Sequence, residues 1–211
     1  MLGTVEKVDR WGSTGITSLA LLASLLLIGA GTSSVFLGES EDISDEAENA
    51  VNDVLKEITT YIQIKNIIGD LDNQGKDMQL KKIVVLAKPL FETTLNLSQL
   101  HIQINNGETI KIFNYNNTYT KSSDDLFKNK LWEKLNKNEY GIIILTDEDN
   151  SIKNTETLNK DLIYFAINIP STLTIHPGDE ITITLIPGEG CINNIDVEIP
   201  FSASSHIVYI Q

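Results

Sequence analysis

The stretch Ile16-Thr-Ser-Leu-Ala-Leu-Leu-Ala-Ser-Leu-Leu-Leu-Ile28 decides how this chain is organised. It lies inside a longer segment, residues 11–38, that contains no charged side chain. As a helix, the stretch and its continuation are long enough to span a bilayer core about 30 Å thick. Three fates are open to such a helix: a cleaved secretory signal, a permanent membrane anchor, or a helix that leaves the membrane to pack in a polymer.

The flanking residues help to separate these fates. A conventional signal peptide has an apolar stretch of roughly 7–15 residues and then a cleavage site, so its removal discards the hydrophobic part. Here the apolar run is longer, and a second helical pattern follows an acidic segment that begins at Glu39. Acidic residues suit the positive end of a helix dipole. Apolar residues then recur at helical spacing: Ala47, Ala50, Val51, Val54, Leu55, Ile58, Tyr61 and Ile62.

Composition excludes several classes of protein. The formal net charge is −13, and Arg10 is the only arginine, which argues against a nucleic-acid partner because phosphate binding needs clustered cations. The single cysteine, Cys191, excludes an internal disulfide and a multi-cysteine metal site. No nucleophile elbow or paired histidine ligands occur, so we expect no enzyme.

The rest of the chain has the pattern of a β-rich head. Beyond about residue 78, short runs rich in Ile, Val, Tyr and Phe alternate with polar turn clusters, which predicts an all-β immunoglobulin-like sandwich. Asn105-Asn106-Gly107-Glu108 predicts a hairpin turn between two strands. Apolar residues alternate with threonine in 180–186, which predicts a strand with one buried face. Residues 122–135 have near-helical apolar spacing and predict a short inserted helix.

Two acidic clusters and two sequons are the candidate sites of the head. Residues 70–77 and Asp147-Glu-Asp149-Asn150 offer oxygen ligands that hard cations use, although neither spacing completes an EF-hand loop. We therefore expect no cofactor, with a structural Ca²⁺ as the alternative to ordinary acidic loops. Asn96-Leu-Ser98 and Asn116-Asn-Thr118 are N-glycosylation acceptor patterns, which become relevant if the chain is secreted.

The start of the hydrophobic segment, Arg10-Trp-Gly-Ser-Thr-Gly-Ile-Thr-Ser-Leu19, resembles the prepilin-type processing site of archaeal flagellins, the archaellins. That family has a short basic leader, a glycine before the cut, and a small-small-Gly-Ile stretch that opens the hydrophobic helix. The strand-like segments 82–86, 161–167 and 179–188 are placed as in the family, as is the C-terminal end, residues 198–211.

The resemblance implies a domain organisation and a site. Cleavage would fall between Gly12 and Ser13, so residues 1–12 form the leader, 13–66 the N-terminal helix and 67–211 the outer β-sandwich domain. The fold class is then α+β. The helix would form the filament core through a set of apolar side chains: Ile16, Leu19, Leu21, Leu22, Leu25, Leu26, Leu27 and Ile28.

The resemblance also implies a structural function. The chain would polymerise, alone or with related archaellins, into an extracellular filament for swimming, and it would lie in the membrane only before assembly. A prepilin-type peptidase and an assembly ATPase with its membrane platform would be its partners. Two alternatives remain open: an adhesion pilin or minor filament subunit, and a membrane-anchored extracellular β binding module.

Overall fold

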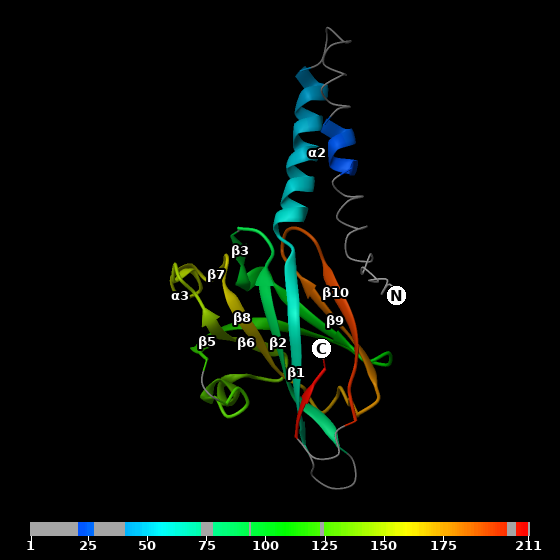
Figure 1. Cartoon of the computed structure of the whole chain (residues 1–211), viewed down its shortest axis with the longest axis vertical. Helices are drawn as coiled ribbons and strands as arrows, with labels where there is room; N and C mark the ends of the chain where they lie inside the picture. Colours follow the sequence, from blue (N-terminus) through cyan, green and yellow to red (C-terminus); the bar gives the residue numbers. More distant parts are fainter. Residues whose placement is uncertain are drawn as a thin grey trace, which may run out of the picture. The chain divides into compact units, whose positions relative to one another are not determined.

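The structure is a computed structural model that describes residues 21–27, 41–72, 78–92, 94–122, 125–201 and 206–210. The chain divides into two units, residues 1–56 and 57–211 (Figure 1). Residues 21–27 of the hydrophobic segment are helical. Among the described residues, no helix has the length and apolarity needed to cross a membrane.

The acidic amphipathic segment forms helix α2, Glu41–Thr59. Its first turn is acidic and Lys56 lies in its last turn, as the helix dipole favours. The predicted helical region extends to residue 66, and this boundary is wrong because strand β1 begins at Ile62. A run of β-branched and aromatic residues, Thr59-Thr60-Tyr61-Ile62, ends the helix, and Ile62 pairs with Pro89 across the sheet.

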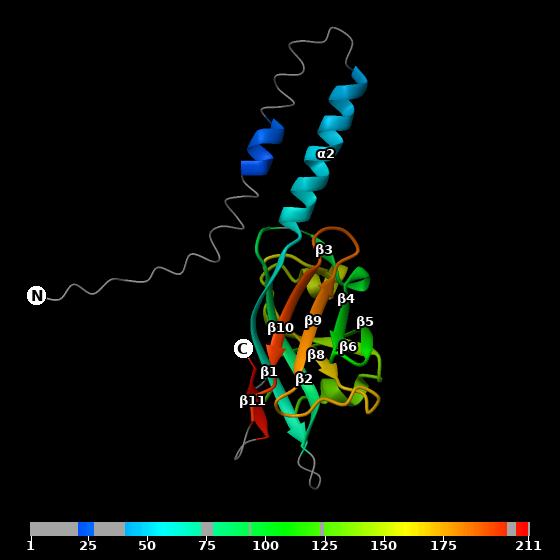
Figure 2. The ribbon, with the colours of Figure 1, turned by 90° about the vertical axis from the view of Figure 1, so that its right-hand side faces the viewer.

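The head is β-rich, as predicted, and nine of its strands form one sheet in the order β10-β9-β4-β5-β6-β8-β2-β1-β11 (Figures 1 and 2). All pairs in this sheet are antiparallel except β5 and β6, which are parallel. Short strands β3 and β7 pair separately. The strands are β1 (Ile62–Asp72), β2 (Gln79–Pro89), β3 (Leu95–Asn96), β4 (His101–Asn105), β5 (Ile110–Lys121), β6 (Glu139–Thr146), β7 (Thr157–Leu158), β8 (Leu162–Asn168), β9 (Glu180–Ile186), β10 (Asn193–Glu198) and β11 (Ile207–Tyr209).

The sheet curls around one hydrophobic core. Side chains from β2, β6 and β8 share this core with side chains from β4, β9 and β10, so the two halves of the sheet face each other. Hydrogen-bonded pairing nevertheless runs without a break from β10 to β11, whereas the predicted sandwich has two separate sheets. Tyr140 lies at the centre, fully buried, and its hydroxyl donates to the carbonyls of Leu97 and Leu100.

A second, smaller core lies on the outer face of the sheet. The segment around η2 (Lys130–Lys134) packs Phe127, Leu131, Trp132 and Leu135 against Val84, Ile143 and Ala166 of β2, β6 and β8. The apolar spacing that predicted a helix over 122–135 therefore marks a covering segment, and its helical part is a short 3₁₀ turn. The Trp132 indole N–H donates to the Leu126 carbonyl, which fixes the segment locally.

Two predicted local features are confirmed. Strands β4 and β5 form the hairpin, with His101 to Asn105 paired against Asn114 to Ile110, and Gly107 has the positive φ of 86° that the turn requires. The segment 180–186 is strand β9, whose isoleucines 181 and 183 are buried. Helix α3, Ser151–Thr155, and the pair β3–β7 were not predicted.

Candidate assembly segment and acidic cluster

The hydrophobic segment exposes its leucines. Within residues 21–27, the exposed fractions are 60% for Leu21, 59% for Leu22, 66% for Leu25, 45% for Leu26 and 59% for Leu27. The Ser24 hydroxyl donates to the Leu21 carbonyl at 3.0 Å, so this polar group has a hydrogen-bond acceptor inside its own helix. Contiguous exposed leucines of this kind are typical of a surface that lipid or another protein covers.

The predicted core set is only partly within the described structure. Leu21, Leu22 and Leu25 to Leu27 lie on the described helical turns, as a helical core requires. Ile16, Leu19, Ile28 and the predicted processing site, Gly12 and Ser13, lie outside the described residues.

In α2, Val51, Val54 and Ile58 are half-buried and follow the i, i+3, i+7 spacing of one helix face, whereas Leu55 remains 52% exposed. The opposite face carries Asn49, Asn52, Asp53 and Lys56, which are exposed. The helix is therefore amphipathic, with an apolar stripe on one face and exposed polar residues on the other.

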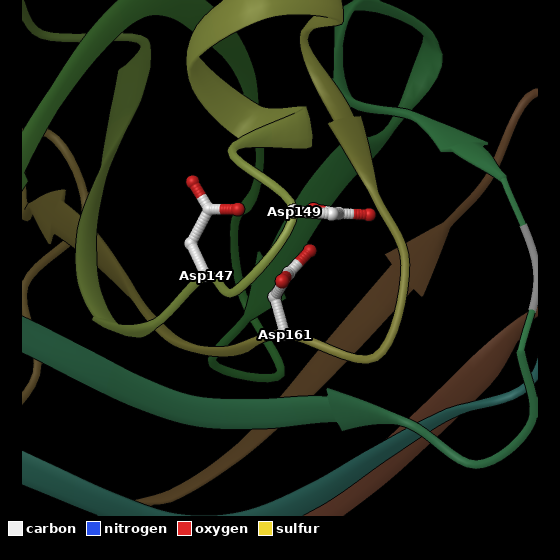
Figure 3. Close-up of side chains that lie close together, drawn as sticks. All are labelled: Asp147, Asp149 and Asp161. Carbon is white, nitrogen blue, oxygen red and sulfur yellow. The ribbon is translucent and has the colours of Figure 1, made fainter.

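Three carboxylates lie close together in the head (Figure 3). Asp147 and Asp149 lie between β6 and α3, and Asp161 immediately precedes β8. One oxygen from each group can be chosen so that all three lie within 4.8 Å of one another. Asp161 is only 4% exposed, so its charge is largely removed from water. Such a set of close oxygens is the donor type that Ca²⁺ and other hard cations prefer.

Hydrogen bonds satisfy Asp149 and Asp161 but leave one oxygen of Asp147 without a partner among the described residues. The Ser151 backbone N–H donates to Asp149 at 2.9 Å and lowers the pKa of that carboxyl. Asp161 accepts from the Asn159 backbone N–H at 2.9 Å and from the Ser151 hydroxyl at 3.2 Å. The Oδ1 atom of Asp147 is buried without a hydrogen-bond partner among the described residues. Burial, and then the charge of Asp161, raise the pKa of Asp147.

The structure separates the two acidic clusters seen in the sequence. The first contains Asp70, which forms an ion pair with Lys82 at 3.7 Å and so already has a cation; residues 73–77 lie outside the described structure. In the second, Glu148 is exposed, while Asp147 and Asp149 join Asp161. Sequence reasoning missed Asp161. An antiparallel β6–β8 pair places the end of β6 beside the start of β8. Recognising this strand pairing would have identified Asp161 as a neighbour of Asp147.

The two sequon asparagines have different surroundings. Asn96 is exposed, and its side-chain oxygen accepts from the backbone N–H and hydroxyl of Ser98, which leaves the amide nitrogen without a bond inside the described chain. Asn116 is half-buried, and its amide nitrogen donates to the Lys134 carbonyl and to Glu139. It lies where the β5–β6 register shifts, so it holds an irregular part of the strand.

Comparisons with known proteins agree on one family. The profile described as archaeal-type flagellin matches residues 12–197. Flagellin B3 of Methanocaldococcus jannaschii is 28% identical, over 96% of this chain and 97% of that protein. Flagellin B4 of Pyrococcus abyssi is 22% identical, over 97% of this chain and 100% of that protein.

Solved structures share the fold. The crystal structure of archaeal flagellin FlaB1 from Methanocaldococcus jannaschii superposes with a TM-score of 0.63 at 18% identity, over 71% of this chain and 96% of that one. The archaeal flagellum of Methanospirillum hungatei gives a TM-score of 0.51 at 13% identity, over 93% and 99%. With a family match that spans most of its length, the chain belongs to the archaeal-type flagellin family and is a structural subunit of the archaellum filament.

Proposed function

We propose that this subunit is exported with a leader, cleaved between Gly12 and Ser13, and polymerised through its hydrophobic N-terminal segment into the core of an extracellular archaellum. The helix would run through residues 13–28 and the head would face outward. The exposed leucines of residues 21–27 carry this proposal, because the described chain leaves about half or more of each of these side chains uncovered.

The energetics of assembly follow from those leucines. Burying apolar surface contributes about 25 cal/mol per Å², so covering the exposed halves of five leucines contributes on the order of 5 kcal/mol per subunit. This driving force acts only outside lipid, because lipid tails solvate leucine as well as a protein core does. Extraction from the membrane therefore needs separate work, which an assembly ATPase and its platform would supply.

The same segment explains an open polymer. Contacts between different surfaces of identical subunits do not close on themselves, so one repeated interface can build a helical filament from this chain or from a mixture of related flagellins. A prepilin-type peptidase would control entry into the polymer, since the leader would end immediately before the apolar helix.

N-terminal mass spectrometry of filaments sheared from cells tests the proposal. The expected result is a mature chain that begins at Ser13. A subunit that keeps residues 1–12 and is recovered only with membranes would contradict polymerisation and favour an anchored module.

The head has two further proposed roles for its side chains. We propose that Asp147, Asp149 and Asp161 hold a structural Ca²⁺, supported by the buried, unpartnered Oδ1 of Asp147 and the burial of Asp161. We also propose that Asn96 is a glycan acceptor because its amide nitrogen is accessible, whereas glycosylation of Asn116 would break two hydrogen bonds.

A further inference from the structure

An acidic groove lies beside strands β9 and β10 and the β4–β5 turn. It has a volume of about 1100 Å³, and five carboxylates line it: Glu108, Asp179, Glu180, Asp196 and Glu198. No lysine or arginine is among its lining residues, and its one histidine, His176, lies beside Asp179. This acidic groove therefore concentrates negative charge on one side of the head.

The groove contains a pair of like charges that the head itself does not neutralise. Glu180 and Glu198 are directly opposite each other on β9 and β10, and both are exposed. Like charges in directly opposite positions destabilise a sheet. Neither glutamate has an ion pair within the described residues, and the same holds for Glu108 at the hairpin turn. A cationic group from outside the subunit could therefore neutralise these glutamates.

A lysine-rich surface lies on another side of the same head. Lys130, Lys134 and Lys137 are exposed on the segment 130–137, which we call the lysine loop, with one acid, Glu133, among them. Within the described chain these three lysines have no ion pair, in contrast to Lys128, which lies 2.8 Å from Asp125. In Figure 1 the loop is on the left of the head, while β9, β10 and the β4–β5 turn are on the right.

The lysine loop is also held in a fixed shape. Leu131, Trp132 and Leu135 are buried against the outer face of the sheet and alternate with the lysines. Asn168 donates to the carbonyls of Trp132 and Leu135, at 3.3 Å each, which anchors the middle of the loop. The lysines are therefore presented outward from a packed base, so little backbone entropy is lost when they bind.

We propose that the lysine loop of one subunit lies in the acidic groove of a neighbouring subunit in the filament. The two surfaces differ from each other, so the contact is heterologous and can repeat along an open polymer. Subunits with a net charge of −13 repel each other in most orientations. The opposite charges of the lysine loop and the acidic groove therefore select the orientation in which these two surfaces meet. This contact rests on the proposed polymerisation and adds a head-to-head interface to it.

Charge reversal in full-length subunits tests the contact. Cells would produce one variant as their only filament subunit. The lysine-loop variant is Lys130→Glu/Lys134→Glu/Lys137→Glu, and the glutamate variant is Glu108→Lys/Glu180→Lys/Glu198→Lys. The sixfold variant combines all six substitutions. We expect each triple variant to yield about tenfold less sheared filament or lower, because every contact becomes repulsive. The sixfold variant should restore the yield to within about twofold of wild type, since its charges are again complementary.

A matched control separates this contact from bulk charge. Lys65, Lys121 and Lys153 are exposed lysines outside the loop, so Lys65→Glu/Lys121→Glu/Lys153→Glu makes the same change in net charge and should keep the wild-type yield. Equal membrane pools of each variant before assembly would show that the heads fold. Normal filament from the lysine-loop variant, or no recovery in the sixfold variant, overturns the proposal.

Other outcomes are also distinguishable. If the glutamate variant reduces filament while the lysine-loop variant assembles normally, the groove contacts something other than the lysine loop and the proposal is wrong. Absence of filament from the wild-type chain would contradict the proposed polymerisation itself. Wild-type filament together with an unaffected lysine-loop variant contradicts only the head-to-head contact.

Discussion

The hydrophobic segment and the core of the head use the same kind of side chain in opposite ways. Leu25 is 66% exposed in its helix, whereas Phe113, Tyr140 and Phe165 are 0% exposed inside the curled sheet. The head buries its apolar side chains within one subunit, whereas in the proposed filament other subunits would bury the segment. Substitutions in the two regions should therefore separate assembly from folding.

The largest expected effect comes from a charge in the segment. Leu25→Asp should abolish filament formation, because a carboxylate buried in an apolar core without a partner costs several kcal/mol per subunit. The head of the detergent-solubilised variant should melt at the wild-type temperature. Leu25→Met is the matched control and should polymerise. Abundant sheared filament from the aspartate variant would place this side chain outside the core.

The converse substitution lies in the head. Phe165→Ala should lower the free energy of unfolding by about 3–5 kcal/mol, since it leaves a cavity beneath Tyr140, whose ring meets Phe165 edge-on. Chemical denaturation, monitored by near-ultraviolet circular dichroism, measures this loss in the free energy of unfolding. Phe201→Ala makes the same change at a side chain that is 79% exposed, and it should cost no more than about 0.5 kcal/mol. Equal losses in both variants would contradict the assigned core.

Binding of a cation at the acidic cluster should change the stability of the head by a smaller amount. At a free Ca²⁺ concentration of a hundred times the dissociation constant, the gain in stability is about 2.7 kcal/mol. Thermal melts with Ca²⁺ and with chelator measure it, and Asp161→Asn should abolish the difference. Asp179→Asn, which removes a carboxylate elsewhere, should retain it. An equal wild-type melting temperature with Ca²⁺ and with chelator would show that this cluster is an ordinary acidic loop.

The stability of the cation-free head should change with pH in a defined direction. Burial and the charge of Asp161 raise the pKa of Asp147, so the folded head binds this proton more tightly than the unfolded chain does. Stability contributed by Asp147 should rise as the pH falls from neutral through its raised pKa. Asp147→Asn should remove that rise, as measured by melts between neutral and mildly acidic pH. An identical pH profile in the variant would contradict the assignment.

The smallest effect is expected at the sequons. Asn96→Gln should remove a glycan from intact filament subunits, detected by mass spectrometry, and leave the melting temperature unchanged because Asn96 is exposed. Asn116→Gln should leave the mass of the glycan unchanged and cost about 1–3 kcal/mol, since Asn116 holds Lys134 and Glu139. A glycan at Asn116 would show that modification precedes folding of this strand.

Local chemistry made part of the head predictable. Asn106-Gly107 identified the β4–β5 hairpin because glycine accepts the positive φ there, and Ile181 and Ile183 identified the buried face of β9. The parallel β5–β6 pair and the curl of a continuous sheet depend on contacts far apart in the chain. Near-helical spacing over 122–135 was misleading, because a covering segment also needs apolar residues at intervals.

The candidate sites show the same limit. Asp147 and Asp149 were visible as an acidic turn, whereas Asp161 joins them only through the β6–β8 pairing. The helix boundary was placed too late because Ile58, Tyr61 and Ile62 fit a helical spacing. Pairing of Ile62 with Pro89 in the sheet decided the conformation of that last residue.

Accessibility of position 25 in intact filaments tests the central claim most directly. In a Cys191→Ser background, Leu25→Cys and Lys121→Cys would each be treated with a membrane-impermeant maleimide, before and after filaments are dissociated in detergent. Our account predicts immediate labelling at position 121, which is exposed on the head, and labelling at position 25 only after dissociation. Equal labelling at both positions in intact filaments would contradict a core built from the hydrophobic segment.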